Sequence, residues 1–277
     1  IDSYRKIRNT LRFLLGNLNN FNKQNLVDPE EMPELERYLL TRISSLNEKL
    51  KELVSKHDYH AIYTALLNFC TLELSAFYFD IRKDSLYCDD IKSIKRRSTS
   101  TCLHIIFEFL TKWLSPIVSF TCEEAWKSRS YSNEESILLQ NVKDDEFTYK
   151  DILLEKVFEE LKRVRKSVTS ALELKRNEKL IGSSLQAKVI LFLSKDTQKI
   201  IADLDLAEMC IVSNVETHDI SNRSKESISI EDEEIYVDIK LADGKKCERC
   251  WAVLQEVSSS KNNLCNRCDD VWKTFQK

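Results

Sequence analysis

Apolar residues recur at steps of three and four through about the first 180 residues, which is the spacing of one face of an α-helix. Pro29 and Pro33 interrupt the polar stretch after the first such pattern, and most later connections are short. Antiparallel neighbours joined by short loops are typical of an up-and-down helical bundle. The pattern predicts helices at about 4–18, 35–53, 59–82, 89–114, 116–126 and 149–178.

A different pattern begins near residue 184. The β-rich run AKVILFL at 187–193 precedes a short helical pattern near 196–203, and Gly182 permits a turn at the boundary. Strand-like runs follow at 210–215, 227–230 and 234–241. The chain is therefore expected to divide into a helical bundle (1–148), a long connecting helix (149–183), a small α/β module (184–243) and a C-terminal tail (244–277).

Composition narrows the class of protein. Only 3 glycines and 3 prolines occur in 277 residues, which disfavours a fold with many tight turns. We find no signal peptide and no apolar run that approaches the roughly 20 residues of a membrane span, so we expect a cytoplasmic protein without membrane contact. The net charge of −3 does not indicate nucleic-acid binding, although it can hide local basic patches.

Four of the nine cysteines form two Cys-x-x-Cys pairs near the end of the chain. Cys247 and Cys250 are separated from Cys265 and Cys268 by 14 residues. Four thiolates in two knuckles suit a tetrahedral Zn²⁺ ion and leave no open position for a substrate, so the predicted zinc is structural. Two disulfides or a redox pair fit less well. The other five cysteines lie singly in apolar stretches, as buried thiols of a reducing compartment do.

The overall prediction is a mainly α protein, with an up-and-down helical bundle, a small α/β module and a C-terminal four-cysteine zinc knuckle. The residues beside the knuckle are basic and aromatic. Basic side chains can neutralise phosphates, and an aromatic ring can stack on an unpaired base. Trp251 can serve that purpose or pack beneath the zinc hairpin, and both interpretations stay open. For Trp272 we expect a core position.

Several stretches together resemble one family. In order and spacing they resemble the C-terminal part of bacterial-type isoleucyl-tRNA synthetases, which are class I enzymes. The segment LSAFYFDIRKDSLYC resembles this family in particular, whereas the helical pattern alone also fits leucyl, valyl or methionyl synthetases. The stretches are YRKIRNTLRFLLGNL (4–18), HDYHAIYTALLNFCTLELSAFYFDIRKDSLYC (57–88), RRSTSTCLHIIFEFL (96–110), LSPIVSFTCEEAW (114–126), ALELKRNEKLIGSSLQAKV (171–189) and the CERCW…CNRC cluster.

This resemblance implies that the bundle and the zinc tail hold the anticodon stem-loop of the isoleucine tRNA. The parent enzyme would attach isoleucine to that tRNA with ATP. The HIGH-like and KMSKS-like signatures of the family's catalytic domain do not occur here. The resemblance thus implies a fragment that is inactive alone and has no catalytic residues, with ATP bound only in the missing catalytic domain. We expect a monomer.

The candidate tRNA-binding residues fall into two groups. Trp251, Arg249 and Lys246 come first, because they lie on the tail that resembles the family's tRNA-contacting tail. For the second group an ordinary solvated face is the simpler interpretation. It consists of Arg5, Arg8 and Arg12 in the first predicted helix and Arg96 and Arg97 in the fourth.

Two other classes of protein stay open. One is a zinc-stabilised nucleic-acid-binding protein such as a DNA-glycosylase relative, but that class needs an N-terminal catalytic segment and a helix–two-turn–helix module, and we see neither. The other is a helical scaffold with an incidental zinc knuckle. A scaffold is consistent with the net charge of −3 but does not explain the basic and aromatic residues at the knuckle. A preference for structured tRNA over DNA separates these classes.

Overall fold

The computed structural model describes the chain except residues 20, 131–134, 141–147, 226, 230–233 and 276–277. The chain forms two compact units, Ile1–Ile152 and Leu153–Lys277. The predicted fold class is confirmed, since helices dominate, one small mixed sheet is present and four cysteines cluster near the C-terminus. The four-part division of the chain stays a prediction.

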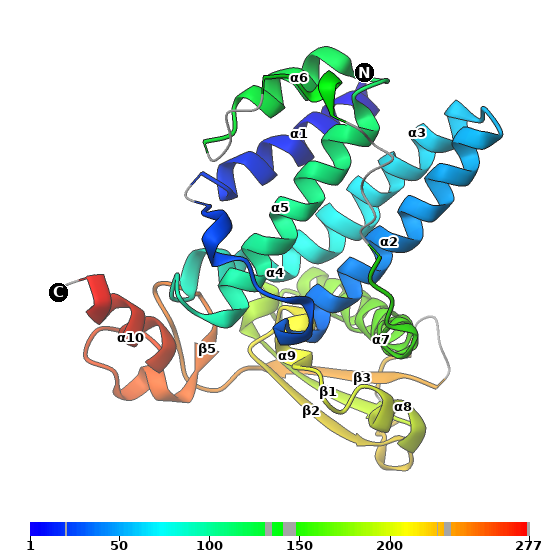
Figure 1. Cartoon of the computed structure of the whole chain (residues 1–277). Coiled ribbons are helices and arrows are strands. Elements are labelled where there is room, and N and C mark those ends of the chain that lie inside the picture. Colours follow the sequence, from blue (N-terminus) through cyan, green and yellow to red (C-terminus); the bar gives the residue numbers. More distant parts are fainter. Residues whose placement is uncertain (20, 131–134, 141–147, 226, 230–233, 276–277) are drawn as a thin grey trace. The chain divides into compact units, whose positions relative to one another are not determined.

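The first unit is a helical bundle built around α5 (Figure 1). Helix α5 contacts the five other α-helices of the bundle, and its buried face includes Leu103, Ile106, Phe107 and Leu110. In α1 the predicted stripe is buried at Ile7, Leu11 and Leu14, which confirms the helical spacing. The helices of this unit are α1 (Asp2–Asn17), α2 (Glu34–Ser55), α3 (Tyr59–Asn68), α4 (Phe79–Cys88), α5 (Ile94–Leu114) and α6 (Ser119–Lys127).

A π-helical segment, Phe69–Tyr78, joins α3 and α4 into one continuous helix of 30 residues. By length and composition this helix is apolar enough to cross a membrane, with a mean hydropathy of 1.2 over its most apolar window. No stretch of this kind was expected from the sequence. Core helices pass the same test, and here Leu66, Cys70 and Leu74 are completely buried among the bundle helices.

The bundle core contains a buried ion pair. Arg82 in α4 donates to both carboxylate oxygens of Glu36 in α2, from Nε to Oε1 and from Nη2 to Oε2, at 2.6 Å each. The Tyr78 hydroxyl and the Thr99 hydroxyl of α5 donate to the same Oε1 atom at 3.0 and 3.2 Å. Because the charges and the lone pairs are satisfied together, the pair joins three helices inside an apolar core.

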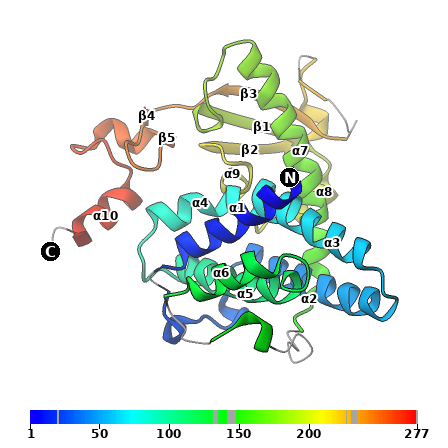
Figure 2. The same cartoon turned by 90° about the horizontal axis from the view of Figure 1, so that it is seen from above.

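The second unit begins at the second residue of α7 (Ile152–Asn177) and contains a three-stranded sheet (Figure 2). Its central strand, β1 (Ala187–Leu193), runs parallel to β2 (Asn214–Asp219) and antiparallel to β3 (Tyr236–Leu241). The apolar run of β1 is almost wholly buried, as expected of a central strand. Two short helices, α8 (Lys195–Ile200) and α9 (Leu206–Cys210), lie between β1 and β2 along the chain.

Polar contacts attach α7 to this sheet region. Arg165 donates from Nε to the Met209 carbonyl at 2.9 Å, and the Thr197 hydroxyl donates to Glu160 at 2.9 Å. The Arg165 guanidinium therefore stabilises the fold of this unit.

Several element boundaries differ from the predictions by a few residues, and two of these differences have a clear local cause. Helix α5 begins at Ile94 and not at residue 89, because Ser93 is the N-cap and accepts a hydrogen bond from the Arg96 amide. The strand predicted at 210–215 begins only at Asn214. The preceding residues end α9, with Ile211 in the left-handed conformation at φ 57°.

A further predicted strand, 227–230, is reduced to one β-bridge between Ile228 and Val237. Its last residue lies outside the described part of the chain.

Candidate metal centre and nucleic-acid interface

Residues 244–275 form a small module that we call the cysteine module. Strands β4 (Lys245–Lys246) and β5 (Val253–Leu254) make a hairpin around the first knuckle. Helix α10 (Asn266–Phe275) carries Cys268, and Cys265 directly precedes it. The described side chains offer little apolar core besides the cysteines, namely the buried Val257 and Val271. Such a module needs another source of stability.

The four cysteines meet at one point. All four Sγ atoms lie within 4.8 Å of one another, and all four residues are buried. No disulfide links any of the nine cysteines. Two sulfurs come from the hairpin and two from the start of α10, which is the tetrahedral donor set of a structural metal site. The residues therefore fit a bound metal ion.

Backbone hydrogen bonds favour the thiolate form of one of the four cysteines, Cys247. Burial raises the pKa of the Cys247 thiol, but backbone N–H groups of Cys250, Cys265 and Arg249 more than offset this and bring it to about 7. Burial raises the pKa of Cys265 to about 11, and the contact with the Cys268 sulfur, followed by burial, raises that of Cys250. Four thiolates this close need a cation to ionise together.

Gly244 marks the entrance to the module. Its φ of 117° lies in the left-handed region, and a Cβ atom there would be 2.2 Å from the backbone carbon of Leu254. Only glycine fits this combination of conformation and close approach. The position went unnoticed in the sequence analysis, although a glycine just before the first knuckle, in a chain with three glycines, was the available signal.

Trp251 projects from the first knuckle with 60% of its surface exposed and a positive φ of 69°. The knuckle holds it in place, since the Trp251 amide donates to the Cys247 carbonyl at 2.9 Å and the Cys247 amide donates to the Ala252 carbonyl at 2.8 Å. Lys246 lies with Nζ 5.1 Å from the centre of the indole ring. Two of the candidates predicted on the tail thus form one cationic and aromatic surface.

Arg249 and Trp272, the other residues considered near the knuckle, differ from their expected exposure to solvent. Arg249 is half-buried and does not stand as open to solvent as Lys246. Trp272 was expected in the core of the module, and that expectation is wrong, because 47% of its surface is exposed. Cys247 and Cys268 occupy the fully buried positions instead, so the sulfur cluster takes the place of an aromatic core.

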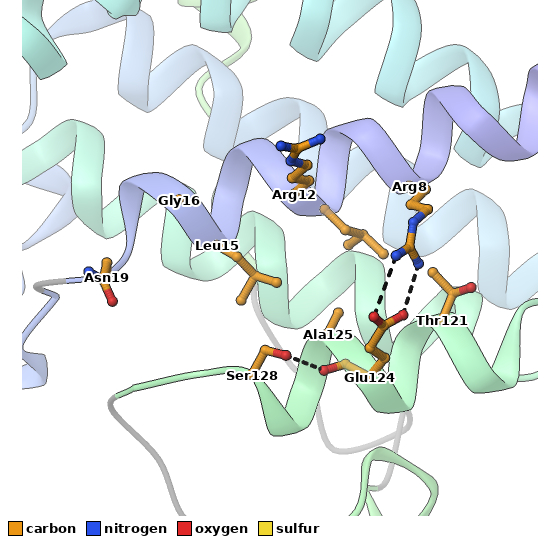
Figure 3. A pocket seen from close by; sticks show the side chains of 10 residues that line it. Arg8, Arg12, Leu15, Gly16, Asn19, Thr121, Glu124, Ala125 and Ser128 are labelled. Carbon is orange, nitrogen blue, oxygen red and sulfur yellow. Dashed lines mark hydrogen bonds and ion pairs between the residues drawn. The ribbon is translucent and has the colours of Figure 1, made fainter.

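The arginines of α1 differ in their surroundings (Figure 3). Arg8 faces Glu124 of α6, with Nη1 2.8 Å from Oε2 and Nη2 3.4 Å from Oε1, whereas Arg12 points away from that carboxylate. Both line a groove of about 480 Å³ between α1 and α6. Arg5 is exposed beside Asp2 at 3.7 Å. Of the three arginines of α1 that were candidates for RNA binding, Arg5 and Arg8 therefore each face a carboxylate.

Arg96 and Arg97 lie in the first turn of α5 and are both half-buried. Arg96 donates from Nη1 to the Asp89 carbonyl at 2.7 Å, and Arg97 Nη2 lies 3.5 Å from the Asn25 carbonyl oxygen. Both guanidinium groups therefore contact carbonyls of neighbouring loops as part of the bundle's own structure. They differ in this from the ordinary solvated face that was the simpler interpretation of the sequence.

Comparisons with known proteins agree with this architecture. Residues 36–191, more than half of the chain, match the family described as the anticodon-binding domain of tRNA ligase. The chain belongs to this family of anticodon-binding domains. Residues 244–271 match a second family, described as the zinc finger found in FPG and IleRS. This second match covers all four cysteines of the metal-binding site.

Curated relatives of this anticodon-binding domain are isoleucine–tRNA ligases. That of Pelagibacter ubique is 45% identical over 91% of this chain and 27% of its own length. Those of Ruegeria pomeroyi and Desulforamulus reducens are 39% and 35% identical over 97% and 98% of this chain. The chain spans 27–30% of the length of these three relatives.

The buried network around Glu36 was absent from the sequence-based candidates. Its signal was available, because Arg82 falls in a helix whose neighbouring turns are apolar, and Glu36 falls between Leu35 and Leu39 on a buried stripe. Charged residues at core positions of two helices predict a buried pair. The segment LSAFYFDIRKDSLYC, which resembled one family in particular, contains Tyr78 and Arg82 of this network.

Proposed function

We propose that this chain binds the anticodon stem-loop of a tRNA as part of an isoleucine–tRNA ligase. The observation that carries the proposal is the match of residues 36–191 to the anticodon-binding domain of tRNA ligases. The names of the relatives favour isoleucine over the leucine, valine and methionine systems that the helical pattern alone also fits. ATP-dependent ligation belongs to the proposed whole protein.

The cysteine module supplies an RNA-binding surface in this proposal. Anticodon bases are single-stranded and can be splayed out onto an aromatic ring. Trp251 offers a ring that is held by its backbone and exposed, and Lys246 beside it brings a positive charge for the adjacent phosphate. Arg249 belongs to the same proposed surface.

The bundle contributes unequally to the proposed contact. Among the arginines of α1, Arg12 is the best candidate because it points away from Glu124. Arg5 and Arg8 contribute less, since carboxylates face them. Arg96 and Arg97 remain candidates, though each already contacts a backbone carbonyl.

We further propose that the metal is Zn²⁺, held by Cys247, Cys250, Cys265 and Cys268. Thiolate donors in a tetrahedron select zinc among the common divalent ions. When bound, zinc supplies folding free energy to the module and carries no reaction step. We also propose that the protein is monomeric, lies in the cytoplasm and does not contact a membrane.

Competition binding tests the function. Labelled isoleucine tRNA is bound to the chain and then competed with unlabelled tRNA or with duplex DNA of equal length. The proposal predicts strong preference for tRNA. Equal competition by DNA would indicate a general nucleic-acid binder, and absence of any binding would support the scaffold.

Substitution of Trp251 tests the surface within the same assay. Trp251→Ala is expected to weaken tRNA binding by about 1–3 kcal/mol, the range for one base–aromatic stack. Trp251→Phe keeps a stacking ring and should retain most of the affinity. Metal content must stay at the wild-type value in both variants. If alanine binds as well as tryptophan, Trp251 is a packing residue and the proposed surface is wrong.

A further inference from the structure

Ser213 joins the cysteine module to the sheet. Its hydroxyl donates to the Leu185 carbonyl at 2.5 Å and accepts from the Val253 amide of β5 at 2.8 Å. Its own amide donates to the Ala187 carbonyl at 3.2 Å. One residue between α9 and β2 therefore holds both the start of β1 and the hairpin that carries the first knuckle.

The second connection between these parts is the chain itself. The Ala242 amide donates to the Gln186 carbonyl at 2.8 Å at the end of β3, and Gly244 then turns the chain into β4. A single connecting segment that contains a glycine lets the hairpin rotate relative to the sheet unless another contact fixes it. The bond from Val253 to Ser213 supplies such a contact on the opposite strand of the hairpin.

The geometry of the hairpin transmits this contact to the exposed tryptophan. Val253 pairs with Lys246 across β4 and β5, and Lys246 lies against the ring of Trp251. The Cys247 amide binds the carbonyl of Ala252, the residue between Trp251 and Val253. The knuckle and the hairpin are thus one rigid piece, and fixing Val253 fixes the direction of Trp251.

We propose that Ser213 is a positioning residue for RNA binding, which orients the Trp251 and Lys246 surface through the Val253 amide. This inference rests on the proposed function. A pre-oriented surface binds more tightly because less freedom is lost on association. Loss of the hydroxyl leaves the module folded around its metal but allows it to swing on Gly244.

The surroundings of Ser213 make the test practical. It lines a groove of about 350 Å³ that is also lined by Lys188, Glu216, Asp243 and Glu256. Lys188 is paired with Glu216 at 2.7 Å, so the groove is acidic overall and a poor site for RNA phosphates. Water can hydrate the Val253 amide from this groove, so Ser213→Ala is expected to fold.

Hydrogen exchange and tRNA binding of the whole chain test the inference together. In Ser213→Ala the Val253 amide should exchange faster while the Cys247 amide keeps its protection. Binding of isoleucine tRNA should weaken by roughly three- to tenfold. Ser213→Thr keeps the hydroxyl and should restore both properties. Ser221→Ala removes a hydroxyl that donates to Asp219 at 2.6 Å, and should change neither.

A double-substitution cycle separates positioning from general destabilisation. In a Trp251→Ala background, Ser213→Ala should cost less than about twofold, because the ring it orients is gone and only Lys246 remains of that surface. An undiminished loss there, equal binding by Ser213→Ala and wild type, or unchanged exchange at Val253 would each overturn the inference. Wild-type chain that fails to bind tRNA would overturn the proposed function itself and, with it, the role given to Ser213.

Discussion

Removing Arg82 should destabilise the bundle far more than removing an exposed arginine. In Arg82→Met, Glu36 would stay buried without its cation and without the two hydrogen bonds of 2.6 Å. Both side chains are at most 1% exposed, so water cannot take the place of the guanidinium. Breaking a buried pair from one side costs about 3–5 kcal/mol. For a unit of this size that corresponds to a lower Tm by about 6–20 °C.

The assay is urea unfolding followed by tryptophan fluorescence. Trp113 and Trp126 are buried in the first unit, whereas Trp251 and Trp272 are already exposed, so the red shift on unfolding reports mainly on the bundle. Arg8→Met is the matched control, because it removes the same side chain from an exposed pair with Glu124 and should change the unfolding free energy far less.

A double substitution tests the physical cause. Glu36→Met combined with Arg82→Met should be less destabilising than the sum of the two single changes, because no unpaired charge is left. The hydroxyls of Tyr78 and Thr99 lose their acceptor in the double variant, so part of the cost persists. If Arg82→Met and Arg8→Met have equal unfolding free energies, the reasoning is refuted.

Three further predictions concern the metal site, Gly244 and the dependence of stability on pH. Cys265→Ala should lose the metal and unfold the cysteine module while the bundle stays helical; wild-type metal content in this variant would contradict the four-sulfur site. Gly244→Ala should release the metal to a chelator faster than wild type, because its Cβ meets Leu254, whereas Gly16→Ala, with nothing within 4 Å, should not. Burial, with nearby cations, lowers the pKa of His104 to about 4. Below pH 6.5, His104 binds a proton in the unfolded chain but stays neutral in the folded chain. The free energy of unfolding should therefore fall by about 3 kcal/mol as the pH drops to 4. Urea unfolding at several pH values measures this, and His104→Asn should lack that component of the pH dependence.

The sequence was informative where one local rule decides the structure. Steps of three and four residues placed the stripe of α1, and the two Cys-x-x-Cys pairs indicated which four cysteines meet in the structure. The run AKVILFL was apolar at every position but Lys188, which is typical of a central strand. In these cases neighbours along the chain are also neighbours in the structure.

The sequence was less informative where distant residues decide. The Arg8 and Glu124 side chains meet across 116 positions of sequence, so an arginine that looked available for RNA proved to be paired. Trp272 looked like the core of the cysteine module because aromatic residues usually fill small cores, yet the sulfur cluster fills this one. Ser213 and Val253, 40 residues apart, gave no signal at all, since a serine in a loop is ordinary.

The most direct test of the central claim is binding of isoleucine tRNA compared with the same tRNA carrying a swapped anticodon, with zinc counted on the same sample. We expect about one zinc ion per chain and at least roughly tenfold weaker binding of the swapped tRNA, the loss of about 1.4 kcal/mol from anticodon contacts. Equal affinity for the two tRNAs, with zinc present, would contradict anticodon recognition by this chain.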